Sequence, residues 1–185
     1  MMRALVLVVA LGCGSTPQAK PAVAWPVPAG WKSETIPFPL DFAPSLAHRG
    51  VEELRFPPGF LKPESPNRWS YAFEWRITDA ADLDAAALGA ELTAYFRGLL
   101  VAVDGDKKRI DANAITASAE KQGEVFVVKA RVLDAFNDAA AIDLEGTAKR
   151  TACGDAKIVW RFVLAPATSP VRGELDALAS LDPCG

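Results

Sequence analysis

The 185-residue chain contains few of the residues that usually carry catalysis or bind metals: one His, three Cys and two Met. With His48 as the single histidine, every Ser-His-Asp or Cys-His scheme must use a residue in the turn-like segment Ala47–Gly50. A zinc site lacks support as well, because the chain has no Cys-x-x-Cys pair and no second histidine. We therefore expect no catalytic histidine, no metal and no other cofactor.

Positive charge is also scarce. The formal net charge is −3 at pH 7, and the largest basic cluster is Lys107-Lys108-Arg109, which we assign to a solvated turn after a helix. The chain has no glycine-rich phosphate loop, no Gly-x-Ser-x-Gly elbow and no His-Glu-x-x-His motif. These absences argue against a nucleic-acid partner and against several common hydrolase classes.

The apolar run at the N-terminus, Ala4–Leu11, is too short to span a bilayer, which takes about 20 residues. It follows Arg3 and fits the core of a cleaved export signal. The next residues complete the tetrad Ala10-Leu11-Gly12-Cys13, which resembles the lipobox of bacterial lipoprotein precursors. Gly12 and Cys13 match the pattern, whereas Ala10 and Leu11 stand in the less usual order. Ala10-Leu11-Gly12 also satisfies the rule for ordinary signal cleavage, so plain secretion stays open, and the doubled Met leaves the start codon open.

The resemblance implies that residues 1–12 are a signal peptide and that Cys13 carries acyl chains such as palmitate, which anchor the protein to a membrane of the cell envelope. Residues 13–30 contain four prolines and predict an extended tether, with Trp25 packing against the start of the domain. Gly14 and Ser15 provide no acidic retention signal. In a Gram-negative host, the expected location is therefore the outer membrane, on its periplasmic or surface side.

The cysteine count supports the anchor. An odd number of cysteines in an exported protein needs an explanation, and lipidation of Cys13 leaves Cys153 and Cys184 as an even pair. We predict a disulfide between these two, which would close a loop of roughly 30 residues and stabilise the fold by about 3–4 kcal/mol. The alternative is two unpaired cysteines.

Residues 31–185 are long enough for one domain with a sizeable core, and half of the chain is apolar. The order of elements predicts an α+β domain, in which a mainly antiparallel sheet of about six or seven strands packs on one long helix, with a short C-terminal helix. This order loosely resembles the Mog1/PsbP layout. The expected strands span 32–38, 51–56, 69–77, 114–120, 125–133, 142–151 and 157–164, and the expected helices span 82–103 and 171–181.

Aromatic side chains are concentrated in the segment 38–75, among prolines and arginines. Four of them, Phe38, Phe42, Phe60 and Trp69, lie in or beside proline-bounded loops. We expect the loops 40–50 and 60–68 to form an exposed aromatic surface for an envelope protein, a glycan or an apolar ligand. The leading interpretation is therefore a non-enzymatic envelope lipoprotein that acts as a binding or assembly module.

The alternative is an envelope hydrolase that acts on glycan through carboxylates near Glu52 and Glu74. Glu52 and Glu53 are adjacent, so they point to opposite faces of a strand and cannot form the pair together. A cleft with two carboxyl groups about 5–10 Å apart would favour the hydrolase. A convex domain with one aromatic patch would favour the binding module.

Overall fold

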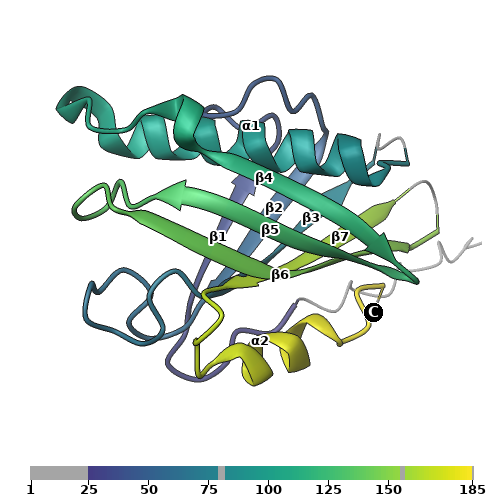
Figure 1. The fold of residues 1–185 in the computed structure, drawn as a ribbon. Coiled ribbons are helices and arrows are strands. Elements are labelled where there is room, and N and C mark those ends of the chain that lie inside the picture. Colours follow the sequence, from purple (N-terminus) through teal and green to yellow (C-terminus); the bar gives the residue numbers. More distant parts are fainter. Residues whose placement is uncertain (1–24, 79–81, 155–156, 185) are drawn as a thin grey trace, which may run out of the picture.

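Seven antiparallel strands form one sheet in the order β1-β2-β3-β7-β6-β5-β4 (Figure 1). The computed structural model describes residues 25–78, 82–154 and 157–184, so the leader, Cys13 and most of the expected tether lie outside the described residues. The strands are β1 Lys32–Pro37, β2 Gly50–Phe56, β3 Tyr71–Ile77, β4 Thr116–Gln122, β5 Val125–Leu133, β6 Ala141–Ala152 and β7 Ile158–Ala165.

Two helices cover the sheet, with α1 (Ala85–Asp104) on one face and α2 (Arg172–Ala179) on the other (Figure 1). Two short 3-10 turns, η1 (Gly105–Lys107) and η2 (Ala112–Ala114), connect α1 to β4. This arrangement confirms the expected α+β class, the antiparallel sheet, the long helix and the short C-terminal helix.

Helix α1 buries one apolar stripe against the sheet. Its N-terminus is capped by Asp84, whose side chain accepts a hydrogen bond of 2.8 Å from the Ala87 amide. The span 85–107 is long and apolar enough to cross a membrane by length and composition, but the stripe packs on the strands as a core helix does. The stripe consists of Leu88, Leu92, Tyr95, Phe96 and Leu100.

Strands β3 and β7 form the centre of the sheet and carry large aromatic side chains toward α1. The rings of Phe73 and Phe162 stack with centroids 4.4 Å apart. The expected strand at 69–77 begins two residues later, at Tyr71, because Trp69 adopts a left-handed backbone conformation (φ 58°) that no strand continues. That bend places the indole of Trp69 in the core under α1.

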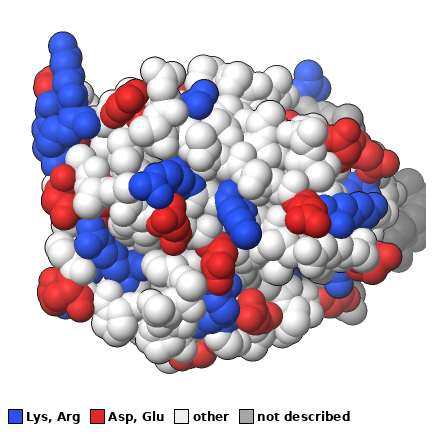
Figure 2. Space-filling view, viewed as in Figure 1, with Lys and Arg blue, Asp and Glu red and all other residues white. Residues whose placement is uncertain are grey.

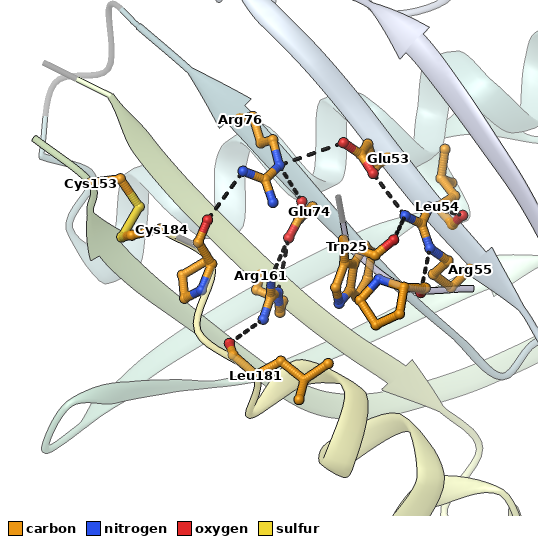
Figure 3. A network of polar contacts seen from close by, with 12 residues as sticks. Trp25, Glu53, Leu54, Arg55, Glu74, Arg76, Cys153, Arg161, Leu181 and Cys184 are labelled. Atoms are coloured by element: carbon orange, nitrogen blue, oxygen red, sulfur yellow. Dashed lines mark hydrogen bonds and ion pairs between the residues drawn. A yellow bond between two sulfur atoms is a disulfide. The ribbon is translucent and has the colours of Figure 1, made fainter. Parts of the chain in front are cut away.

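The opposite face of the sheet holds both ends of the described chain (Figure 3). Cys153 and Cys184 form the predicted disulfide, with Cα atoms 5.0 Å apart. Trp25 is buried between the guanidinium groups of Arg55 and Arg161, which lie 4.6 and 4.9 Å from its ring centroid. These contacts hold Trp25 against the sheet, as expected for this residue.

Candidate functional site

An open groove of about 770 Å³ lies beside the edge strand β1. Its walls come from the start of β1, the end of β2, the loop 57–62 and the connection between β5 and β6. We call it the aromatic groove. It is lined by Gly30, Lys32, Ser33, Glu34, Phe56, Pro57, Pro58, Gly59, Phe60, Leu61, Lys62 and Phe136.

A smaller inner cavity of about 80 Å³ adjoins the groove and shares Glu34, Phe56, Phe60 and Phe136 with it. It reaches between the sheet and α1, since two of its lining residues, Tyr95 and Leu99, belong to that helix. The other residues that line it are Ile36, Phe42, Leu54, Trp69 and Tyr71.

The rings around the inner cavity meet at many different angles. Phe60 contacts Phe56 at a tilted angle (4.7 Å between centroids) and Tyr71 edge-on (5.4 Å). Phe42 contacts Tyr95 edge-on at 5.4 Å, on the helix side. Phe56 and Tyr71, which also line the cavity, stack with centroids 6.0 Å apart. The rings therefore surround the cavity from both the sheet and the helix.

Backbone geometry brings the two aromatic loops to this cavity. The Trp69 amide donates a hydrogen bond of 3.1 Å to the Phe60 carbonyl, which closes the loop between them. The loop that carries Phe42 lies directly on α1 at Gly98, where a Cβ atom would stand 1.9 Å from the Phe42 carbonyl oxygen. Only glycine permits this approach, so Gly98 positions Phe42 over the helix.

The four aromatic residues singled out in the sequence lie in different places in the structure. Phe42, Phe60 and Trp69 come together around the inner cavity. Phe38 does not: it packs edge-on against Trp75, with centroids 6.0 Å apart, and lines neither hollow. The expected exposed patch is absent at these residues, because Phe38 and Trp69 are buried and Phe42 and Phe60 are half-buried in the core that the sheet and α1 form. Phe42, Phe60 and Trp69 line a recess instead.

Glu52 is the most unusual polar group near the cavity. It lies on the α1 side of β2, fully buried, and its Oε1 accepts a hydrogen bond of 3.1 Å from the Trp75 indole nitrogen. Burial raises its pKa from 4.5 to about 7, partly offset by the Trp75 and Tyr95 side chains, while the Glu34 carboxylate adds a small further increase. Its second oxygen, Oε2, has no hydrogen-bond partner among the described residues.

Two tyrosine hydroxyls belong to the same buried region. Burial raises the pKa of Tyr71 and of Tyr95 well above the usual value, and the charge of Glu52 raises both further. Both tyrosines therefore stay protonated at physiological pH. The Tyr71 hydroxyl, like Glu52 Oε2, is buried and lacks a partner within the described part of the chain. Two polar atoms thus remain unsatisfied in one aromatic region, which is uncommon in folded proteins.

Glu74 lies on the other face of the sheet from Glu52. The register pairs Glu53 with Glu74 and Glu52 with Trp75, so β3 presents Glu74 toward α2. The Arg161 guanidinium donates two hydrogen bonds to Glu74, at 2.7 and 2.9 Å, and Arg76 bonds its other oxygen (Figure 3). The carboxylate pair of the hydrolase interpretation is therefore wrong for these two residues, because the sheet separates them.

The arginines around Glu74 also fasten the C-terminal tail. Arg161 donates a hydrogen bond of 2.6 Å to the Leu181 carbonyl, and Arg76 donates one of 3.1 Å to the Pro183 carbonyl (Figure 3). Every charge in this network has a partner that holds the chain. The network therefore has a structural explanation and offers no free group to a ligand.

His48, the single histidine, is buried rather than exposed in a turn. Its Nε2 lies 2.9 Å from Glu91 Oε2, and its ring contacts Phe38 and Trp75. The pair links the loop 38–50 to α1, because Glu91 lies on that helix, 43 positions further along the chain. It lines neither the groove nor the inner cavity.

Sequence reasoning did not select Tyr71 or Phe136 as site residues, and it named Glu52 only as a candidate hydrolase carboxylate. Glu52 could have been recognised from its position, since Glu52, Leu54 and Phe56 share one face of β2. A carboxylate on an otherwise apolar face is costly to bury, so it indicates a special role. Tyr71 lies in an apolar stripe in the same way. Phe136 carries no signal of this kind, because only the tertiary fold brings it to a loop more than 70 positions earlier.

The outer surface gives no competing site of one charge in the view shown. Lys and Arg intermingle with Asp and Glu across this face (Figure 2). Comparison of the chain with family models, with curated proteins and with solved structures finds no match. The function is therefore inferred from the geometry of the groove and cavity.

Proposed function

We propose that the protein is a lipid-anchored binding protein of the cell envelope, without enzymatic activity, which holds a small amphipathic molecule in the aromatic groove. Cys13 carries the anchor, and the groove admits the apolar part of the ligand. The observation that carries the proposal is the continuity between an open groove and an aromatic inner cavity. Recesses that are mostly apolar and contain a few convergent polar groups are typical of small-molecule sites.

The size of the hollows supports a small molecule over a protein partner. The groove falls within the usual range of ligand pockets, about 300–1,000 Å³. Its apolar rings face a recess, whereas a protein-docking patch would present them on an open surface. The hydrolase has less support, because Glu74 is held by two arginines and Glu52 lines neither hollow.

The anchor is tested by mass spectrometry of the protein purified from membranes. We expect an N-terminus at Cys13 with the mass of added acyl chains, and no residues from 1–12. Cys13→Ser is the matched control, and this variant should no longer be found in the membrane fraction. An unmodified Cys13 at the N-terminus would instead assign plain secretion, and a chain that still begins at Met1 or Met2 would contradict cleavage.

Binding is tested with the uncharged fluorophore N-phenyl-1-naphthylamine, in a Cys13→Ser background that needs no detergent. We expect saturable binding to one site, with affinity reduced about fivefold by Leu61→Ser, since that change removes apolar contact from the groove wall. Leu61 is 48% exposed, so its loss should leave the fold intact.

The control is Val101→Ser on α1, at a residue that is 46% exposed and lies outside the groove. It makes a comparable apolar-to-polar change on the surface. Equal affinities of the two variants and the parent would show that the fluorophore binds elsewhere and would contradict the proposal.

A further inference from the structure

We propose that the ligand carries an organic ammonium group and that the inner cavity is the site for this cation. The inference rests on the proposed function, because it names the chemistry of the ligand that the groove would hold. It is carried by three features of the inner cavity: its aromatic walls, the sign of the charge that faces it, and an unsatisfied carboxylate oxygen in the core beside it.

The walls suit a cation that is poorly hydrated. Rings from four separate parts of the chain line the cavity: Phe42 before β2, Phe60 before β3, Tyr95 on α1 and Phe136 after β5. An alkylated ammonium group among aromatic rings gains cation–π attraction and loses little hydration. A small anion would meet the negative ring faces instead.

The charge around the cavity has one sign. Glu34 is the one charged side chain among the described residues that line it, and it stands where the cavity meets the groove. The lysines of the site, Lys32 and Lys62, line the outer groove and not the inner cavity. A ligand with an ammonium group at its inner end and an acidic group at its outer end matches this polarity.

Glu52 adds negative charge from behind the walls. Its Oε2 is unpartnered, and its charge acts on the hydroxyls of Tyr71 and Tyr95, both of which line the cavity. A buried carboxylate without a counter-charge is costly, and a bound cation relieves that cost. A cation in the cavity would supply, across the tyrosine walls, the counter-charge that Glu52 lacks among the described residues.

The test compares two probes that differ in a single atom: phosphocholine, and 3,3-dimethylbutyl phosphate, in which carbon replaces the charged nitrogen. Calorimetric titration at pH 8 keeps most of Glu52 ionised. We expect phosphocholine to bind about tenfold more tightly, the range that a desolvated cation–π contact provides. Equal binding of the two probes would overturn the inference while leaving the proposed function in place.

Variants locate the preference for the cation. Glu34→Gln alters an exposed residue, and Glu52→Gln keeps the size of a buried one. Each should reduce the preference for phosphocholine severalfold without weakening the binding of 3,3-dimethylbutyl phosphate. Glu124→Gln is the control, since it removes one exposed negative charge in the β4–β5 turn, outside both hollows. A preference for phosphocholine that survives both Glu34→Gln and Glu52→Gln would overturn the assignment to this cavity.

Two further results are informative. The first shows whether the ammonium inference fails alone or together with the proposed function, and the second identifies the source of the ligand. If N-phenyl-1-naphthylamine binds and neither phosphate probe does, the ammonium inference is overturned alone; if none of the three binds, both fail. A short-chain phosphatidylcholine below its micelle concentration distinguishes a lipid headgroup, which would bind more tightly than phosphocholine, from a free solute, which would not.

Discussion

Replacing Glu52 with glutamine should stabilise the protein increasingly as the pH rises from 4.5 to 7. In the unfolded chain this carboxyl titrates at its ordinary pKa of 4.5, whereas burial raises the pKa to about 7 in the folded protein. Between these values the folded state holds a proton that the unfolded state has lost, so stability falls as pH rises, by about 1.4 kcal/mol per pH unit. The total loss is about 3 kcal/mol and is complete above pH 7.

Urea unfolding of the parent and of Glu52→Gln at several pH values measures this effect. The difference in unfolding free energy between the two proteins should grow by about 3 kcal/mol from pH 4.5 to pH 8 and then stay constant. All other ionisable groups are present in both proteins, so the difference isolates the contribution of Glu52. Parallel stability curves would contradict the account of Glu52 as a costly buried carboxylate.

Replacing Glu74 with glutamine should destabilise the protein by about 3–5 kcal/mol, because it leaves buried guanidinium charge without its counter-ion. Glu74 is fully buried, and Arg161, which pairs with it, is 4% exposed. The loss should also loosen Trp25 and the C-terminal tail, since Arg161 contacts the Trp25 ring and the Leu181 carbonyl. Thermal or urea unfolding measures the change.

The control for Glu74 is a surface ion pair on the same sheet. Arg131 and Asp143 lie 2.9 Å apart on neighbouring strands, with side chains 53% and 75% exposed. Asp143→Asn should cost less than about 1 kcal/mol, because water screens that pair. Losses of similar size at Glu74 and Asp143 would show that the buried network contributes no more than a surface contact.

The elements could be predicted because their patterns are local. The three- and four-residue spacing in α1 reflects burial of one face, which the structure confirms. The strands β3 and β7 were also placed by their alternation, although the structure buries them on both faces because they are central in the sheet. The strand start at Trp69 could not be read from alternation, since the left-handed conformation of that residue comes from the loop closure with Phe60. A regular pattern does not reveal where the backbone bends out of it.

The site was only partly predictable. Phe42, Phe60 and Trp69 were recognised by their loop setting, but their shared recess depends on contacts between distant segments, including Phe136. The opposite placement of Glu52 and Glu74 required the register of β2 on β3, which no single strand encodes. Local sequence thus indicates which residues are unusual, and the tertiary fold decides which of them meet.

The most direct test of the central claim is the location of bound N-phenyl-1-naphthylamine, mapped by amide chemical shifts of the isotope-labelled full-length protein. We expect saturable shifts concentrated at Lys32–Glu34, at Phe60–Lys62 and around Phe136, the three segments that meet at the groove. Shifts confined to another face, such as the β4–β6 surface around Lys129 and Glu145, or no saturable shifts at all, would contradict a binding site in the aromatic groove.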